Sequence, residues 1–208
     1  MVRRSEILKA SPKMFENDFL DFFTRVHPAV PVVLFAPVIA VLAAVGIDGT
    51  GAVAIAWMAG GYVFWTLTEY WLHRVVFHFE PDHPLGQRFH FMIHGVHHDH
   101  PNDRLRLVMP PSASIPLAAL FLLLFWAVLG PGDWAAFGAG FLGGYLAYDM
   151  LHYHVHHHVP KSRVGKKLRE LHMRHHFQDG DRGFGVSAPY WDHVFGTAPR
   201  QRRRGTPS

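Results

Sequence analysis

Four long stretches without a charged side chain constrain the fold of this sequence more than any other feature. They are residues 29–47, 49–68, 110–129 and 134–148, all rich in Val, Ala, Leu, Phe and Gly. Each approaches the ~20 residues that an α-helix needs to cross the hydrocarbon core of a bilayer. Helices of soluble proteins usually keep a polar face, which these stretches lack. The sequence therefore predicts an all-α integral membrane protein and disfavours a soluble bundle of four buried helices.

We predict a four-transmembrane-helix bundle with a cytoplasmic helical cap. The predicted N-terminal segment is residues 1–28, the single membrane domain is residues 29–198 and a basic, disordered tail is residues 199–208. The predicted transmembrane helices are residues 29–47, 50–72, 110–130 and 133–152. Residues 73–109 and 153–198 lie between or after these helices and are predicted to form the cap.

The positions of the basic residues predict the topology. All 20 Lys and Arg residues lie in the N-terminal segment, in residues 73–109 or in residues 152–208. The short connections around Asp48 and Asp133 contain none. The positive-inside rule then places the three basic segments in the cytoplasm, so that the helices form two hairpins with both termini inside. We attribute the net charge of +4 to this topology and expect no binding to nucleic acid.

Histidine is unusually abundant, and cysteine is absent. The chain has 18 histidines among 208 residues, against 16 Asp and Glu residues in total. The absence of cysteine excludes disulfide scaffolds, iron–sulfur clusters held by thiolates and thiol catalysis. Because the histidines occur in separate clusters and not in one terminal run, they indicate metal chemistry.

Ten histidines form four clusters with spacings that suit metal binding. Residues at i, i+3 and i+4 share one face of a helix, so three of the clusters can each direct two or three imidazoles to one centre. The remaining spacing, i to i+5, indicates a helix end or a shifted helix. The clusters are His73 and His78; His94, His97 and His98; His152 and His156; and His172, His175 and His176.

The predicted topology brings all four clusters to the same membrane face. Ten imidazoles exceed the six positions around one octahedral ion, whereas two ions with four or five nitrogens each would use them and leave open positions. Neutral imidazole suits zinc, copper, iron and nickel. We therefore predict a di-metal centre in the cap.

Three further residues are candidates for the site. Glu69 lies four residues before His73, and Asp149 lies three before His152, so each acid falls on the helical face of a histidine. Metal-bound histidines usually donate their second N–H to a carboxylate or a carbonyl, which is the role that we predict for both acids. Tyr148 is predicted to donate a hydrogen bond to oxygen or to a substrate head group.

These motifs, in this order, resemble the sterol desaturase/fatty acid hydroxylase superfamily, and within it the fatty acid 2-hydroxylases. The resemblance rests on EYWLHRVVFHF (69–79), FHFMIHGVHHDHP (89–101), YDMLHYHVHH (148–157), HMRHHF (172–177) and FGVSAPYWDHVFGT (184–197). It implies a di-iron centre held by the ten clustered histidines. It also implies the use of O2 to hydroxylate a long-chain fatty acid or acyl lipid at C2. Zinc is expected to occupy the same nitrogens in overexpressed protein.

The resemblance also bears on partners and location. Fungal and animal members of the family carry an amino-terminal haem domain, whereas 28 residues precede the first predicted helix here. We therefore expect a separate electron donor, either a cytochrome b-type protein or a ferredoxin with its reductase. The excess of 15 Arg over 5 Lys and the compact length favour a bacterial inner (plasma) membrane.

Three alternatives remain at the level of sequence. The same scaffold serves sterol and carotenoid hydroxylases and desaturases. A metal-binding or metal-transport membrane protein is the alternative outside enzymes, although transporters usually place their ligands near the middle of the membrane. A soluble zinc hydrolase is a weaker alternative because of the apolar stretches.

Overall fold

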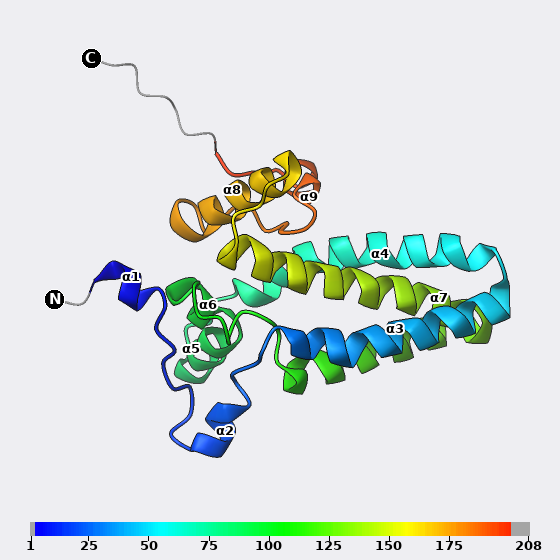
Figure 1. Cartoon of the computed structure of the whole chain (residues 1–208), viewed down its shortest axis with the longest axis horizontal. Helices are drawn as coiled ribbons and strands as arrows, with labels where there is room; N and C mark the ends of the chain where they lie inside the picture. The colour runs from blue at the N-terminus through cyan, green and yellow to red at the C-terminus, as the bar shows by residue number, and fades with distance from the viewer. Residues whose placement is uncertain (1–2, 201–208) are drawn as a thin grey trace, which may run out of the picture.

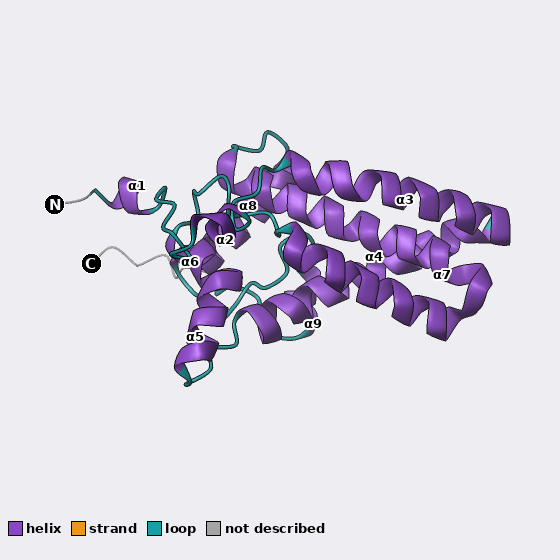
Figure 2. Cartoon of the chain, turned by 90° about the horizontal axis from the view of Figure 1, so that it is seen from below, coloured by secondary structure: helices purple, strands orange, loops and turns teal. Residues whose placement is uncertain are grey.

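The computed structural model describes residues 3–200, and every regular element within that range is helical (Figure 2). This confirms the all-α class. The predicted tail lies outside the described residues from position 201 onward. The elements are α1 (Arg4–Ile7), α2 (Asp18–Phe22), α3 (Ala29–Thr50), α4 (Val53–Trp71), η1 (Leu72–Phe77), α5 (Pro84–His90), η2 (Phe91–Gly95), α6 (Val96–Asp99), α7 (Pro111–His157), α8 (Arg163–Phe177) and α9 (Tyr190–Val194).

The four apolar stretches form four helical segments that lie side by side (Figure 1). α3 and α4 are joined by a turn at Gly51, and α7 is broken at Gly130, whose φ of 77° and ψ of 179° are not helical. A positive φ is readily adopted only by glycine, so Gly130 lets the chain reverse and divides α7 into two antiparallel halves. Both turns lie at one end of the bundle, and the cap lies at the other.

Close contact between α4 and the second half of α7 forms the centre of the bundle. A Cβ atom on Gly140 would overlap the carbonyl group of Met58, and one on Gly61 would overlap the carbonyl group of Phe137. Small residues at such positions allow helix backbones to approach closely, as they commonly do in membrane proteins. Large side chains, among them Trp65 and Phe141, fill the remaining core.

The outer surface of the bundle is apolar, as a lipid environment requires. Val33 and Ile55 are each 70% exposed, and Val128 is 72% exposed. Among the described helices, α3 and α7 are long and apolar enough to cross a membrane, with mean hydropathies of 2.7 and 2.3 over their best windows. The second half of α7 continues to His157, five residues beyond the end predicted from the apolar stretch. The second half of α7 therefore runs from the bundle into the cap without a break.

The N-terminal segment is attached to the cap by a buried carboxylate. Asp21 is 2% exposed, accepts a hydrogen bond from the backbone N–H of Met14 at 2.7 Å, and pairs with Arg106 at 3.2 Å and with Arg25. The backbone N–H of Val26 also donates to the carbonyl oxygen of Leu105 at 2.6 Å. These contacts hold the start of the chain beside the cap, where Figure 1 also shows α1 and α2.

Candidate metal centre

All ten clustered histidines come together in the cap, in two groups of five. In each group, one nitrogen from every histidine lies within 4.8 Å of the others. Most members are buried. Group A contains His73, His78, His94, His98 and His175, and group B contains His97, His152, His156, His172 and His176.

The i to i+5 spacing of the first cluster is explained by a π-helical turn. The backbone N–H of His78 donates to the carbonyl oxygen of His73 at 3.2 Å, directly after η1. A π-helix closes i to i+5 hydrogen bonds, so it brings together residues that an α-helix would separate around its axis. The sequence indicated a helix end or a shifted helix here, and the structure contains a π turn that ends at His78.

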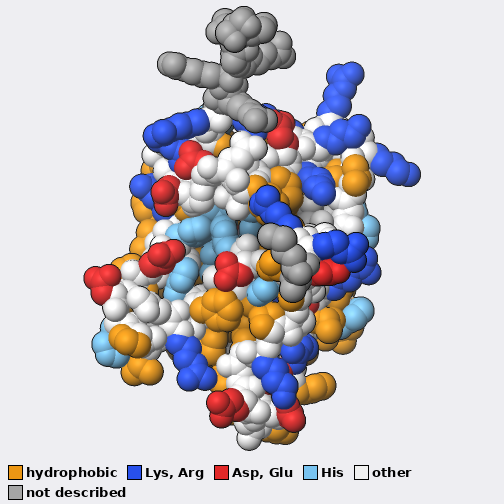
Figure 3. Space-filling view, turned by 90° about the vertical axis from the view of Figure 1, so that its left-hand side faces the viewer, with side chains coloured by type: hydrophobic (Ala, Val, Ile, Leu, Met, Phe, Trp, Pro, Cys, Tyr) orange, Lys and Arg blue, Asp and Glu red, His pale blue; other side chains and the backbone are white. Residues whose placement is uncertain are grey.

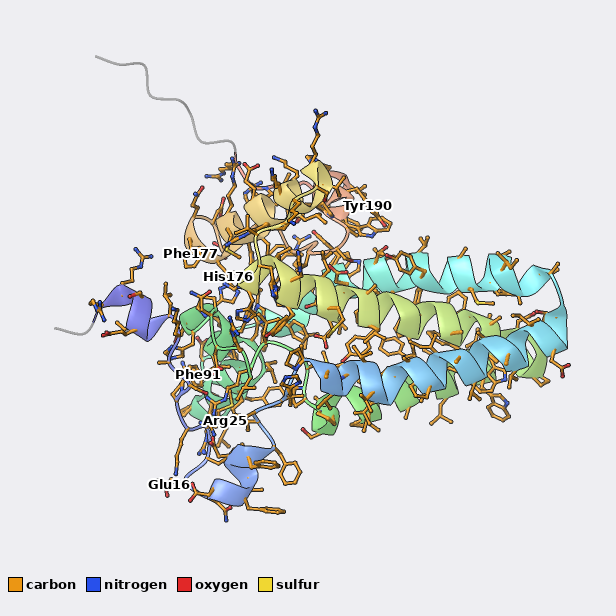
Figure 4. The ribbon with its side chains drawn as sticks, in the orientation of Figure 1. Glu16, Arg25, Phe91, His176, Phe177 and Tyr190 are labelled. Carbon is orange, nitrogen blue, oxygen red and sulfur yellow. The ribbon has the colours of Figure 1, made fainter. Side chains whose placement is uncertain are left out.

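The two H-x2-H-H clusters are each divided between the groups. In η2 and α6, His94 and His98 belong to group A and His97 belongs to group B. In α8 the assignment is reversed, because His172 and His176 belong to group B and His175 belongs to group A. The imidazole rings of His98 and His176 consequently stack with their centroids 4.3 Å apart, one from each group. Figure 4 shows His176 between α8 and the end of α7. The groups are therefore neighbours and together form one candidate di-metal centre.

The Nε2 atoms converge on one point in each group. In group A, Nε2 of His94 lies 3.1 Å from that of His73, 3.2 Å from that of His78 and 3.0 Å from that of His98. In group B, Nε2 of His172 has three neighbours of the same kind. It lies 2.9 Å from Nε2 of His152, 2.8 Å from that of His156 and 3.1 Å from that of His176.

These distances fit histidines that share a metal ion. Metal–nitrogen bonds of about 2.0–2.1 Å place two ligands at right angles about 3 Å apart, as observed between the Nε2 atoms. Nε2 of His97 is buried in group B and has no hydrogen-bond partner among the described residues. A buried nitrogen in that state is costly unless another group, such as an ion, satisfies it. The residues present therefore fit two bound metal ions, one in each group.

Burial keeps the histidines of the cap in the form that binds metal. It lowers the pKa of His94, His97 and His172 well below the usual value for histidine, and the neighbouring histidines lower it further. The same causes lower the pKa of His78 to about 3 and that of His98 to about 2. Imidazole binds metal only when neutral, so these side chains remain available as ligands at neutral pH.

A polar groove leads from the surface of the cap to group A. Its volume is about 450 Å³, and His78, His94 and His98 form its inner wall. Glu80 and Asp99, which are both exposed, also line it. Figure 3 shows histidine side chains exposed in this hollow face of the cap. Group A is thus accessible from the side that faces away from the bundle.

The predicted acids lie near the histidines but contact other partners. Glu69 is 2% exposed and accepts hydrogen bonds from the backbone N–H of Ser187, at 2.8 Å, and from its hydroxyl group. Asp149 accepts from the backbone N–H of Met109 at 3.4 Å and from the hydroxyl of Tyr145 at 3.5 Å. Both acids therefore attach loops to the bundle, and neither has the predicted histidine as its hydrogen-bond partner.

The second nitrogen of two histidines in group A instead faces backbone carbonyl groups. His73 Nδ1 donates to the carbonyl oxygen of Phe184 at 2.6 Å, and His175 Nδ1 donates to that of Arg182 at 2.8 Å. Both carbonyls belong to the loop between α8 and α9. Sequence reasoning did not find these partners, because a carbonyl group is present at every residue and carries no signal in the sequence.

Tyr148 lies beside group B. Its side chain is buried, and its ring stacks on that of His152 with centroids 5.6 Å apart. The ring also packs against that of Trp65, with centroids 5.8 Å apart. The tyrosine therefore stands between the core of the bundle and the histidines, where the sequence predicted a site residue.

Comparisons with known proteins agree with this architecture. The family model described as fatty acid hydroxylase matches residues 57–197. The chain is 40% identical over 194 residues to a dihydroceramide fatty acyl 2-hydroxylase of Arabidopsis thaliana, covering 90% of this chain and 80% of that protein. It is 38% identical over 194 residues to a ceramide very long chain fatty acid hydroxylase of Saccharomyces cerevisiae, covering 91% of this chain and 50% of that one.

A solved structure has the same fold. It is described as full-length scs7p with only the hydroxylase domain visible. The two chains superpose with a TM-score of 0.83 at 33% sequence identity, and the match covers 93% of this chain and 82% of the other. Both the sequence and the arrangement of helices are therefore shared over most of the length.

Proposed function

Because the chain belongs to the fatty acid hydroxylase family and is a hydroxylase enzyme of the membrane, we propose that it is a di-iron oxygenase. Its proposed substrate is a long-chain fatty acid or acyl lipid, hydroxylated at C2 with O2. The observation that carries the proposal is the pair of adjacent five-histidine groups. The names of the relatives, which are fatty acyl 2-hydroxylases and fatty acid hydroxylases, support the choice of substrate.

The ten histidines would hold the two iron ions, one in each group. When bound, the ions would supply the activation of O2 and the oxidation of the C–H bond, which no side chain of the protein can perform. The protein contributes neutral imidazoles at fixed positions and a buried site that excludes bulk water. Zinc prefers the same nitrogen donors and is expected in protein purified after overexpression.

The bundle would bind the acyl chain. A small apolar cavity lies between α4 and the two halves of α7, with Trp65, Phe121, Phe141 and Tyr145 in its wall. Apart from Ser114, an acyl chain entering from the bilayer would meet apolar and aromatic side chains there. The ring of Tyr148 lies between Trp65 of this core and His152, which supports a role for its hydroxyl group as a hydrogen-bond donor to the polar end of the substrate.

The reaction also requires electrons from another protein. We propose a separate donor, either a cytochrome b-type protein or a ferredoxin with its reductase. The polar groove at His78 and His98 supports an approach from the cap, because it is the side on which group A reaches the surface.

We further propose that the four helical segments span a bacterial inner membrane, with the termini and the cap in the cytoplasm. The distribution of all 20 Lys and Arg residues supports this orientation. The chain has no native cysteine, so single cysteines can report the topology. Thr50→Cys and Gly132→Cys should react with an impermeant thiol reagent outside intact cells, whereas Ser162→Cys should react only after lysis. Labelling of Ser162→Cys from outside would contradict the proposed orientation.

Lipid mass spectrometry tests the hydroxylase activity. The intact chain is expressed in cells that contain a suitable electron donor, and the His97→Ala variant is the control. We expect one acyl lipid class to gain one oxygen with the intact chain, located at C2 by fragmentation, and no gain with the variant. The absence of any such lipid when the donor is active would contradict the proposal.

A further inference from the structure

The loop between α8 and α9 presents two backbone carbonyls to group A. The carbonyl of Phe184 accepts from His73 Nδ1, and that of Arg182 accepts from His175 Nδ1. Since a carbonyl can only accept, both histidines carry their proton on Nδ1 and direct the lone pair of Nε2 to the centre of the group. Such partners fix the orientation of a metal-binding imidazole and make it a better donor.

Each of these carbonyls belongs to a planar peptide unit that is held at its opposite edge. The C=O of Phe184 shares its plane with the N–H of Gly185, and the C=O of Arg182 shares its plane with the N–H of Gly183. The N–H of Gly185 donates to Oδ2 of Asp192 at 2.9 Å. The N–H of Gly183 donates to the carbonyl oxygen of Thr197 at 2.9 Å. Fixing the N–H edge therefore fixes the direction of the C=O edge.

Asp192 connects both of these contacts. Its side chain is 1% exposed, and its Oδ1 accepts from the backbone N–H of Phe184 at 2.9 Å and from the hydroxyl of Thr197 at 2.8 Å. The backbone N–H of Thr197 donates to the carbonyl oxygen of Asp192 at 2.7 Å. Asp192 thus holds the Phe184–Gly185 peptide directly and the Arg182–Gly183 peptide through Thr197.

Group B has no equivalent support among the described residues. Nδ1 of His172 and Nδ1 of His176 are buried and lack a hydrogen-bond partner there. The loop therefore acts on one group of the pair, and this asymmetry provides a way to test its role.

We propose that Asp192 is a positioning residue for group A, which acts on His73 and His175 through two peptide units and touches neither histidine. The proposal rests on the proposed function in one respect, namely that group A holds a metal ion. It assigns the carboxylate a role in metal affinity beyond the stability of the fold. Asp192→Asn keeps the size of the side chain but leaves one acceptor oxygen, so one of the two backbone N–H groups loses its partner.

The experiment measures zinc retention of the purified full chain against a graded series of chelator concentrations. It uses two backgrounds. His172→Ala removes the central histidine of group B, and His94→Ala removes the central histidine of group A. In the His172→Ala background, where the metal remains in group A, Asp192→Asn should lower zinc affinity about 10- to 100-fold. In the His94→Ala background it should change zinc affinity less than twofold. Glu170→Gln, at an exposed acid of α8, is the control and should have no effect in either background.

A second variant decides the outcome if Asp192→Asn does not fold. Thr197→Val keeps the shape of the side chain and removes the hydroxyl, which donates to Asp192 and also contacts the hydroxyl of Tyr70 at 2.9 Å. A smaller loss confined to group A is expected. Equal losses from both groups, or no loss from group A, would overturn the positioning role. If the unmodified chain binds no zinc at all, the proposed function fails together with this inference. If it binds two ions and Asp192→Asn weakens both equally, the inference alone fails.

Discussion

Groups A and B each contain five histidines, but the backbone that carries those histidines differs between the groups. Group B takes two i, i+4 pairs from regular helices, His152 with His156 on α7 and His172 with His176 on α8. Group A takes His73 and His78 from the π-helical end of α4 and depends on loop carbonyls for orientation. One half of the candidate centre is therefore a property of helix geometry, and the other half is a property of irregular backbone.

The difference also extends to exposure. Group A borders the polar groove through His78 and His98, whereas group B lies against the end of the bundle beside Tyr148. Irregular segments have few of the repeating hydrogen bonds that stabilise a helix, so they open more readily. We expect group A to be the half that loses metal first when the protein is perturbed.

Removal of the central ligand of either group should have the largest effect. His94→Ala and His172→Ala should each abolish turnover, because the proposed reaction uses both ions, and each should lose the metal of its own group only. Metal content and lipid hydroxylation measure the two effects. His154→Ala, an exposed histidine on α7, is the matched control and should keep both metals and full activity. Full activity in either ligand variant would contradict the assignment of that group.

An insertion in the π turn should separate the two groups. An alanine inserted after Val76 would give the first cluster an i to i+6 spacing, which neither an α turn (i to i+4) nor a π turn (i to i+5) brings to one face. We expect zinc in group A to fall below detection while group B keeps its ion, as measured by metal analysis in the two backgrounds. Val76→Ala preserves the spacing and serves as the control. Retention of both ions by the insertion variant would show that the register of His78 in the π turn is dispensable.

Glu69→Gln should have a moderate effect on the same group. The carboxylate accepts two hydrogen bonds from Ser187, which lies in the loop that supports His73 and His175. The carboxamide can accept only one of them, and we expect a loss of about 10- to 100-fold in the zinc affinity of group A. Glu170→Gln on the exposed face of α8 should leave zinc binding unchanged. A larger loss from group B than from group A would count against the contacts of Glu69 described above.

Acid should destabilise the metal-free protein gradually. The pKa of His78 is lowered to about 3 and that of His98 to about 2, whereas histidine in an unfolded chain titrates near 6.5. Below pH 6.5 the unfolded chain takes up protons that the folded chain excludes, so the free energy of unfolding falls as the pH decreases. The expected slope is roughly 1.4 kcal/mol per pH unit for each such histidine. Thermal melting of chelator-treated protein between pH 7.5 and 5 measures it, and a flat profile would contradict the burial of these rings.

The sequence contained enough to predict the helical class and the histidines that converge. The long uncharged stretches indicated helices, and the repeated H-x2-H-H spacing indicated a shared helical face. The spacing of His73 and His78 also indicated an irregularity that the structure identifies as a π turn. These features depend on the local period of the chain, which can be read from the sequence alone.

Other features of the site depend on contacts between distant segments and were not predicted. The sequence did not indicate that α6 and α8 divide their histidines between two groups in opposite ways. It suggested histidine partners for Glu69 and Asp149 because each acid lies on the same helical face. The folded chain places Ser187 against Glu69 and Met109 against Asp149, and these residues come from loops far away in the sequence.

The number of metal ions per chain tests the central claim most directly. The purified full chain, shown to be folded by its helical circular dichroism, is loaded with Fe(II) without oxygen, freed of excess metal and analysed for iron. Two groups of five converging imidazoles predict two ions per chain, falling to one in either the His94→Ala or the His172→Ala variant. Fewer than one ion per folded chain would contradict a di-metal centre in this cap.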